Sequence, residues 1–442
     1  MDVRAPTLSG EIEPIERETI RRVSWRLMPL LMLGIFFAYV DRVNVGMAAT
    51  TMNKALGFSN AVFGFGAGVF YFGYFLFEIP SNLILEKVGA RRWLARIMVT
   101  WAIIAGITAF VWNDWSFYTI RFFLGLAEAG MFPGCMLYLL WWFPSYYRSR
   151  MMAIFCSAQV FSAVVGGPVG SLLLQLDGWL GLQGWQWLFL IEALPTVIMA
   201  WVTWQLLTDK PADAAWLKPD QKAWLIERLA SEQAQKEAIR KFSLAESFYN
   251  WKIWMLTVAF FGQNVGVFTL MFFTPLIVQG QGVSTHWIGV VAGLPYVVAI
   301  VAMNLWGRHS DLTGERTFHL AGAYLLCAAG MAACILIGLG HPVWMMVALC
   351  VATAGVWCGP PVFWAVPSAL LTGSAAAGGF ALISSVGNLG GWFGPSVFGL
   401  LKDLTGSDNT ALFCLALAPV ISAILVIVVG HDPRLERIPR WS

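Results

Sequence analysis

Three ionisable residues lie inside long apolar segments of the chain. Asp41 and Arg42 lie within residues 27–48, and Glu128 lies near the middle of residues 117–142. If these segments cross a bilayer, each such group costs about 2.5–3.5 kcal/mol on insertion scales, so it must face an aqueous cavity or pair with another charge. We expect these residues to serve the passage of charged solutes. A purely structural network of ion pairs is the alternative.

Asp41 and Arg42 cannot both face one partner, because neighbouring helical residues point about 100° apart. The planar guanidinium of Arg42 suits a substrate carboxylate. Asp41 is then expected to face the helix that carries Glu128. Because two carboxyl groups in a low-dielectric cavity hold protons more readily than in water, the pattern predicts an anion site beside two proton carriers.

Other polar residues in these segments carry weaker signals. Arg121 lies seven residues before Glu128, two turns along the same face. It either acts on that carboxyl group or extends its head to the membrane interface. Tyr39 is a weaker candidate for the cavity. Glu78 and Glu192 each lie close to the end of an apolar segment, so we expect them to cap a helix or to form a structural pair.

The composition identifies the elements that must hold these residues. Of the 442 residues, 58% are hydrophobic and 12% are charged, against about 45–50% and about 25% in soluble domains. This excludes one soluble domain and intrinsic disorder. The net charge of +3 is too small to indicate nucleic acid. The histidines and cysteines lack metal-ligand spacing, so we expect no metal, no cofactor and no enzymatic centre, and residues 1–24 predict no cleaved signal peptide.

Twelve apolar segments are long enough to cross a membrane as helices, and they lack the alternation of β-barrel strands. The expected fold class is therefore an all-α membrane protein. The segments cover residues 27–48, 61–85, 93–112, 117–142, 152–174, 185–207, 253–278, 287–306, 318–339, 343–370, 376–400 and 411–429.

A polar interval between the sixth and seventh segments divides the chain. Within it Trp224, Leu225 and Leu229 have helical spacing, which predicts an amphipathic helix on the membrane surface. The expected parts are a cytoplasmic N-terminal segment, a six-helix bundle, a cytoplasmic linker, a second six-helix bundle and a cytoplasmic tail. They cover residues 1–24, 25–207, 208–250, 251–430 and 431–442.

Lysine and arginine gather on one side of the expected membrane, and only Lys54 and Lys402 fall on the other side. By the positive-inside rule this places both termini in the cytoplasm. We expect a multi-pass protein of the cell inner (plasma) membrane.

A loop pattern of an acid, a glycine and a base occurs twice. Glu86, Gly89 and Arg91 recur 225 positions later as Asp311, Gly314 and Arg316. Two matching halves predict a duplicated transporter architecture with its site between the halves.

The second half has no ionisable residue at the positions equivalent to Asp41 and Glu128, which are Val267 and Ala354. Proton coupling is therefore expected in the first half only. The second half offers neutral polar side chains, and buried amides among them often serve to hold helices together. These residues are Gln263, Asn264, Ser384, Ser385 and Asn388.

These features carry a family resemblance over essentially the whole chain. The paired loops resemble the signature loop of the Major Facilitator Superfamily, although Asn82 and Glu86 stand where that loop usually has Gly and Asp. The segments DRVNVG (41–46), EIPSN (78–82) and RFFLGLAEAG (121–130) resemble the anion:cation symporter family, with tartrate-transporter-like members the nearest.

The resemblance implies twelve transmembrane helices in two six-helix bundles that import an organic carboxylate with protons. Asp41 and Glu128 would be the proton-coupling pair, and Arg121 would control their protonation. The implied substrate contacts are Arg42, Tyr74, Gln159 and Asn388, to which Tyr39 and Ser384 are added as cavity candidates. The implied conformational latch comprises Glu86, Arg91, Asp311 and Arg316.

Several alternatives stay open. An uncoupled facilitator or anion exchanger would have the same fold, whereas a membrane sensor is disfavoured because no segment is long enough for a signalling domain. The expected partners are an organic anion, protons and the lipid bilayer, and the expected state is a monomer. Tartrate-like hydroxy-dicarboxylates, sugar acids and aromatic carboxylates all satisfy one arginine with amides and hydroxyls.

Overall fold

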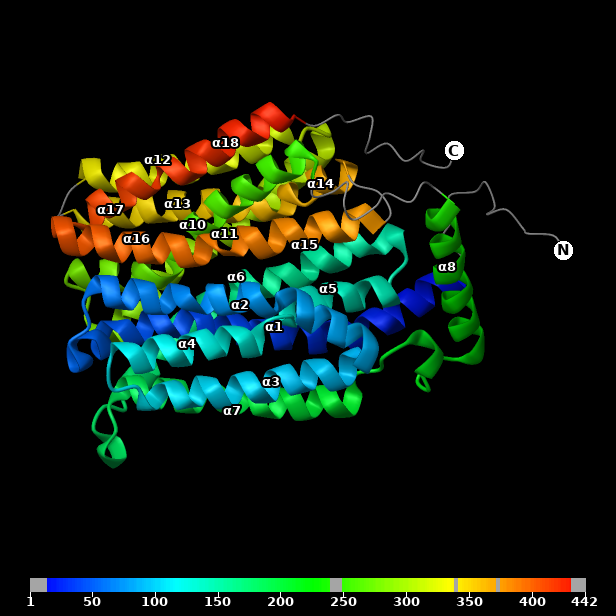
Figure 1. The fold of residues 1–442 in the computed structure, drawn as a ribbon, viewed down its shortest axis with the longest axis horizontal. Coiled ribbons are helices and arrows are strands. Elements are labelled where there is room, and N and C mark those ends of the chain that lie inside the picture. Colours follow the sequence, from blue (N-terminus) through cyan, green and yellow to red (C-terminus); the bar gives the residue numbers. More distant parts are fainter. Residues whose placement is uncertain (1–13, 239–248, 338–340, 371–373, 431–442) are drawn as a thin grey trace.

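The computed structural model describes residues 14–238, 249–337, 341–370 and 374–430. All regular elements in these ranges are helical, and Figure 1 shows most of them running side by side along the long axis of the molecule. Among the described residues, eleven helices are long and apolar enough to cross a membrane. The all-α membrane fold expected from the apolar segments is therefore confirmed.

The first half of the chain contributes six spans, in which α1 packs against α6 and α7, α2 against α4, and α3 against α7. Their helices are α1 (Pro14–Leu56), α2 (Asn60–Val88), α3 (Ala90–Ile107), α4 (Asp114–Glu128) with α5 (Met131–Trp142), α6 (Ser145–Leu174) and α7 (Gly184–Leu206). Single 3₁₀ turns η1 (Thr108–Phe110) and η2 (Trp179–Gly181) lie between them.

The second half repeats this plan, with α10 against α16 and α18, α11 against α13, and α12 against α18. Its helices are α10 (Trp251–Gly280), α11 (Thr285–Thr313), α12 (Thr317–Ile337), α13 (Pro342–Phe363) with α14 (Ala365–Leu370), α15 (Ser374–Asn388) with α16 (Gly390–Thr405), and α17 (Asp408–Leu415) with α18 (Leu417–Val429). α15 and α16 follow each other over the eleventh expected segment, which is why neither half of it is long enough to count as a span alone.

The first helix is longer than its apolar segment predicts. α1 begins at Pro14, well before residue 27. Ile20, Val23 and Leu27 are buried at helical spacing, so the added turns are amphipathic and pack one face against the rest of the protein. Hydropathy alone misses such turns because their other face is polar.

Helix α8 (Pro219–Ala238) lies in the polar interval between the halves, after the 3₁₀ turn η3 (Pro211–Asp213). Figure 1 shows it crossing one end of the molecule, next to the start of α1. Leu225 is buried there, Arg22 donates to Gln221 over 3.4 Å, and Lys218 pairs with Glu18 at 3.3 Å. We refer to this end as the α8 end and to the other as the opposite end.

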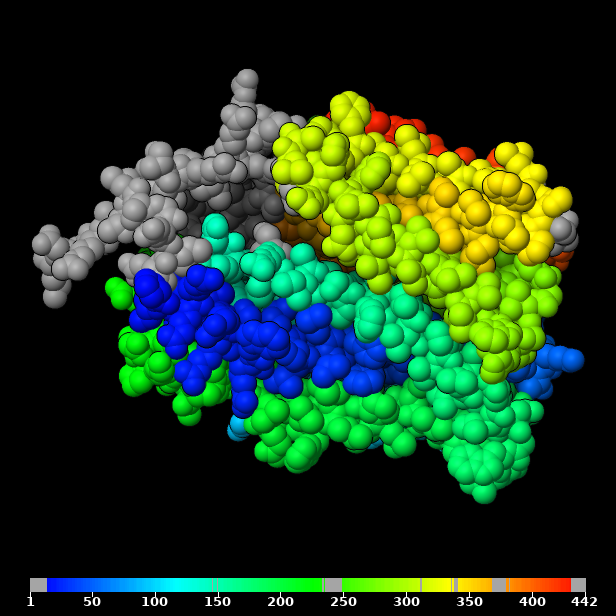
Figure 2. Space-filling model, turned by 180° about the vertical axis from the view of Figure 1, so that it is seen from behind, coloured from blue at the N-terminus to red at the C-terminus, as the bar shows by residue number. Residues whose placement is uncertain are grey.

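The two halves meet chiefly along three helix pairs, α2 with α16, α6 with α11 and α1 with α10, and α2 also contacts α15. In Figure 2, α6 and α11 lie side by side across the boundary between the halves. A methyl group on Gly64 of α2 would overlap the Pro395 carbonyl oxygen, and one on Gly289 of α11 would overlap Gly167 of α6. Glycine at these positions allows the backbones of the two halves to touch.

Hydrogen bonds close the opposite end across the halves. Asp403 of α16 accepts from the backbone amides of Asn60 and Ala61 at 3.1 and 2.7 Å, and from Asn60 Nδ2 at 2.7 Å. Gln279 Nε2 donates to the Thr50 carbonyl oxygen at 3.0 Å. Asp403 thus caps the first turn of α2 from the other half of the molecule.

Candidate functional site

The centre of the first half holds a buried ion pair between two helices. Arg42 of α1 donates from Nη2 to Oε1 of Glu128, the last residue of α4. The exposed fractions of the two residues are 5% and 1%. The buried charges that the sequence placed in this region therefore compensate each other, as charges out of water must.

A break in the fourth span positions Glu128. The chain leaves helical geometry at Ala129, and Gly130 has φ +92° before α5 begins at Met131. A side chain on Gly130 would overlap Ser81 Oγ, so only glycine permits this left-handed turn. The break places the carboxyl group at a helix end deep inside the bundle.

Aromatic rings surround the guanidinium of Arg42. Its Cζ lies 4.5 Å from the ring centre of Tyr39, 5.5 Å from that of Tyr74, 5.3 Å from that of Phe70 and 5.7 Å from that of Tyr71. The negative faces of such rings attract a cation. The structure thus brings together Arg42, Tyr39 and Tyr74 as expected. It adds Phe70 and Tyr71, which a hydropathy analysis of the sequence groups with the lipid-facing residues.

The partner of Asp41 differs from the expectation. Arg42, and not Asp41, contacts Glu128, while Asp41 accepts a hydrogen bond from Trp101 Nε1 of α3 and a longer one, 3.5 Å, from Asn44 Nδ2. The sequence shows only that neighbouring residues face different directions. Which of the two side chains faces α4 depends on how α1 is rotated about its axis in the bundle.

Glu192 belongs to the same group of buried residues. Asn44 Nδ2 donates to its Oε2 at 2.8 Å, and Glu192 is 6% exposed in the interior of α7. The predicted role as a helix cap is therefore wrong. Asn44 links the two carboxyl groups Asp41 and Glu192.

Arg121 is also enclosed and does not extend to an interface. Its exposed fraction is 1%, its Nη2 donates to the Ala67 carbonyl oxygen at 3.3 Å, and its Cζ lies 4.9 Å from the ring centre of Phe70. Phe70 thus contacts both buried guanidinium groups.

Glu78 does not cap a helix end either. It lies ten residues before the end of α2, it is 2% exposed, and its Oε1 accepts from Ser384 Oγ of α15 at 2.8 Å. Ser385 and Asn388 lie next to the same carboxylate. The structure therefore joins the first half to the predicted second-half residues Ser384 and Asn388 through the carboxylate of Glu78, for which the sequence predicts only a cap or a structural pair.

The remaining residues predicted to contact the substrate, Asn388 and Gln159, form hydrogen bonds with residues other than Arg42. Asn388 Oδ1 accepts from Asn264 Nδ2 of α10 at 3.3 Å. Gln159 is buried on α6, where its carbonyl oxygen accepts from Ser162 Oγ at 2.6 Å.

Several polar atoms around the ion pair are buried without a hydrogen-bond partner in the described part of the chain. They are Arg42 Nε, Tyr71 Oη, Glu128 Oε2 and Glu192 Oε1. Buried polar atoms are normally paired, so each unpaired one calls for an explanation. Together these atoms leave donors and acceptors unpaired in the interior of the first half, among the described residues.

Comparison with known proteins identifies the chain. A family model described as the Major Facilitator Superfamily matches residues 31–395. The chain belongs to the Major Facilitator Superfamily. It is a membrane transporter and not an enzyme, and its sequence resemblance to tartrate-transporter-like members is confirmed.

Two relatives and one solved structure illustrate the match. An Agrobacterium vitis protein named "Putative tartrate transporter" is 46% identical over 417 residues, 94% of this chain and 96% of the relative. The "Quinolone resistance transporter" of Acinetobacter baumannii is 38% identical over 424 residues, 96% of each chain. A crystal structure of a D-xylose-proton symporter superposes with a TM-score of 0.75 at 14% identity, covering 93% of this chain and 99% of that one, which shows the shared fold.

The first superfamily signature loop, which contains Glu86, Gly89 and Arg91, lies at the α8 end and accepts a helix cap from a residue outside the motif. The backbone amide of Arg91 donates to Asp209 Oδ1 at 2.8 Å, so Asp209, which follows α7, caps the start of α3. The Arg91 guanidinium lies 5.8 Å from a Trp204 ring, and Glu86 is exposed.

In the second signature loop the cap comes from the loop itself. Glu315 accepts from the amides of Phe318 and His319 at 2.7 and 3.0 Å, and Arg316 Nη1 donates to Ser310 Oγ at 3.1 Å. Burial acts to raise the pKa of the Glu315 carboxyl group, but these amide hydrogen bonds, together with the hydrogen bond and charge of the His319 ring, outweigh it and lower the pKa. The side chain of Asp311, the predicted latch acid, lies outside the described residues.

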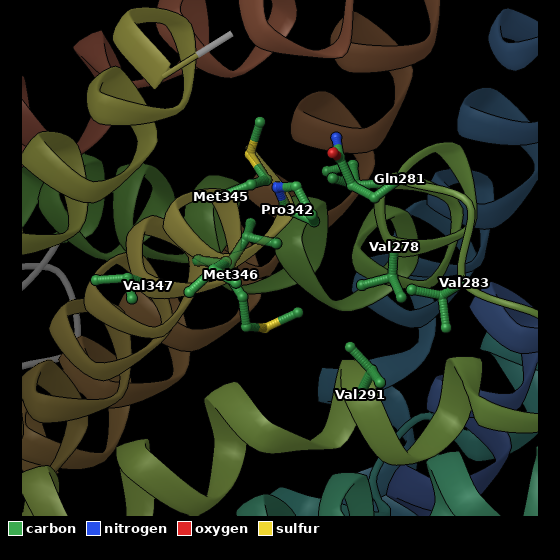
Figure 3. A pocket seen from close by; sticks show the side chains of 11 residues that line it. Val278, Gln281, Val283, Val291, Pro342, Met345, Met346 and Val347 are labelled. Carbon is green, nitrogen blue, oxygen red and sulfur yellow. The ribbon is translucent and has the colours of Figure 1, made fainter. Parts of the chain in front are cut away.

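An apolar pocket of about 340 Å³ lies elsewhere in this superfamily member, at the opposite end between α10, α11 and α13. Figure 3 shows Val278 and Val291 across from Met345 and Met346, with Gln281 at its edge. Its lining lacks charged side chains, so it does not suit an organic anion.

Proposed function

We propose that this superfamily member is a proton-coupled symporter that imports an organic carboxylate across the cell inner membrane by alternating access. The observation that carries the proposal is the buried contact between Arg42 and Glu128. A guanidinium that already holds a carboxylate in the protein interior has the geometry to hold a substrate carboxylate instead.

The exchange of partners couples substrate to protons. When a substrate carboxylate takes the place of Glu128 on Arg42, Glu128 is left buried without a counter-charge. A buried carboxylate in that situation binds a proton, because an unpaired ion in a low-dielectric interior costs several kcal/mol. Asp41, held apart from the pair by Trp101 and Asn44, provides a second proton site.

The aromatic rings favour this exchange. Tyr39 and Tyr74 lie against the guanidinium and not between it and the carboxylate, so they hold the cation in place whichever carboxylate it binds. The Lys and Arg distribution supports an arrangement with the α8 end in the cytoplasm. The name of the Agrobacterium relative supports an organic acid as the substrate class.

Transport measurements with Glu128→Gln test the proposal. Purified protein in proteoliposomes should accumulate labelled tartrate when the outside is acidic, and added tartrate should carry protons inward. Because glutamine cannot bind a proton, we expect Glu128→Gln to lose acceleration by the pH gradient while it still exchanges internal for external tartrate.

Glu227→Gln makes the same chemical change on an exposed face of α8 and should behave as the unmodified protein does. Full acceleration by the pH gradient in Glu128→Gln would contradict the assignment. Uptake by the unmodified protein that ignores the gradient would indicate a facilitator or exchanger.

A further inference from the structure

Glu78 is a buried carboxylate at the boundary between the two halves. Its Oε1 accepts from the neutral hydroxyl of Ser384 at 2.8 Å, and its Oε2 is buried without a hydrogen-bond partner in the described ranges. A carboxylate offers about four acceptor positions. Its Oε2, with Ser385 and Asn388 of α15 nearby, therefore keeps an acceptor position open in a region that solvent does not reach.

This carboxylate lies along α2 from the Arg42 site. Tyr74, whose ring lies 5.5 Å from the Arg42 guanidinium, precedes Glu78 by four residues, so one helical turn of about 5.4 Å separates them on the same face. Ser385 and Asn388 of α15 border Glu78 from the second half. Arg42 and Glu78 thus lie on either side of Tyr74.

We propose that Glu78 accepts hydrogen bonds from hydroxyl groups of the substrate, so that the transported anion is a hydroxylated carboxylate. This inference rests on the function proposed above and assigns the second end of the same site. The carboxylate of the substrate binds Arg42, and its hydroxyl groups reach Glu78 and the α15 residues.

The chemistry of Glu78 selects among the acids that Arg42 alone would accept. The Glu78 carboxyl group offers an acceptor oxygen in either protonation state, so it matches a hydroxyl and not a methylene or an aromatic edge. An analogue without the hydroxyl would leave the buried oxygen unpaired, and sites of this kind reject such analogues strongly. In a dicarboxylate such as malate or tartrate, the second carboxylate is expected to lie away from Glu78, because two carboxylates in one buried site repel each other.

Matched pairs of acids test this inference in direct binding to purified protein by calorimetry. L-malate differs from succinate by one hydroxyl group, and gluconate differs from hexanoate by several. L-aspartate carries an ammonium group where L-malate has its hydroxyl. We expect the hydroxylated member of at least one pair to bind about 100-fold more tightly or better, within the range of sites that recognise a hydroxyl. Glu78→Leu should reduce this ratio to near one, and Glu78→Gln should reduce it by roughly tenfold.

The ratio, and not the affinity, is the decisive readout. If Glu78 only joined the halves, its replacement would weaken both members of a pair equally. An unchanged ratio in folded Glu78→Leu and Glu78→Gln, or a stronger binding of aspartate than of malate, would overturn the inference. Equal binding of both members in every pair by the unmodified protein would do the same.

Failure of the proposed function gives a different pattern. In that case no carboxylate of either pair would bind the unmodified protein, or Arg42→Ala would leave binding intact. Glu227→Gln on the exposed face of α8 serves as the control and should preserve both affinity and ratio.

Discussion

Arg42 is the residue on which the site is centred. It pairs with Glu128, its guanidinium lies against four aromatic rings, and its Nε is buried without a hydrogen-bond partner among the described residues. Planarity matters for each of these contacts, because a flat, delocalised cation can stack on rings while its edge binds a carboxylate. A lysine ammonium is a compact point charge that cannot do both.

Arg42→Lys should therefore impair substrate binding without removing the charge. We expect the KM for tartrate uptake to rise roughly tenfold or more, which corresponds to about 1.4 kcal/mol, in protein that remains folded by thermal unfolding. Arg96→Lys is a matched control, because the Arg96 guanidinium also stacks on an aromatic ring, Trp93, at 3.8 Å but lies outside the site. An unchanged KM in Arg42→Lys would mean that the carboxylate binds elsewhere.

Among the elements, α2 connects the most features of the molecule. Its first turn is capped by Asp403 of the other half, its glycines touch α16, and its interior carries Tyr74 and Glu78. A movement of α2 relative to α15 and α16 would therefore change the opposite end and the substrate site together. This is the physical requirement of alternating access.

Asp403→Asn should weaken closure of the opposite end. The substitution removes the negative charge at the start of α2 and an acceptor oxygen, and helix caps contribute roughly 0.5–2 kcal/mol. Spin labels on Lys54 and Leu404, which are exposed at that end, should show an increased population of longer distances.

Asp177→Asn is the matched control for this experiment. Asp177 accepts from the amide of Gly184 at 2.8 Å at the start of α7, so it also caps a helix at the opposite end, but within one half. Its replacement should leave the distance distribution between the labels unchanged. A response equal to that of Asp403→Asn would show that the effect does not come from the contact between the halves.

On the scale of the whole molecule, the two halves touch at the opposite end through α1 and α10 as well as α2 and α16. Transport by alternating access requires these contacts to open. A reversible link across them should therefore stop uptake, whatever the substrate.

Two cysteines provide this link when they replace Thr50 and Gln279 and are joined by a reducible bifunctional thiol reagent. We expect tartrate uptake to fall to background after cross-linking and to recover after reduction. The pair Ala109 and Gln186 has the same type of hydrogen bond, from a side-chain amide to a backbone carbonyl at 2.8 Å, within the first half, and its cross-linking should leave uptake intact. Uptake that continues through a complete Thr50–Gln279 link would contradict rigid-body opening at this end.

The sequence alone determined the membrane class, the location of most spans and the buried charges. Long apolar segments have few other solutions, because backbone hydrogen bonds must be satisfied within each segment in a bilayer. The cost of a buried charge likewise indicated Asp41, Arg42 and Glu128 without a structure. The segments located the ends of the spans less well, since α1 runs from Pro14 to Leu56, α6 begins at Ser145 and α11 ends at Thr313, each several residues beyond its apolar segment.

Only the tertiary structure decided which side chains meet. Helical periodicity fixes the faces of one helix relative to each other, but not the neighbour that each face contacts. For this reason the sequence assigned Asp41 to Glu128 where Arg42 makes the contact, and placed Glu78 at a helix end where it reaches Ser384. The caps supplied by Asp209 and Asp403 come from distant segments, and such partners are determined by the packing of the helices and not by any local pattern.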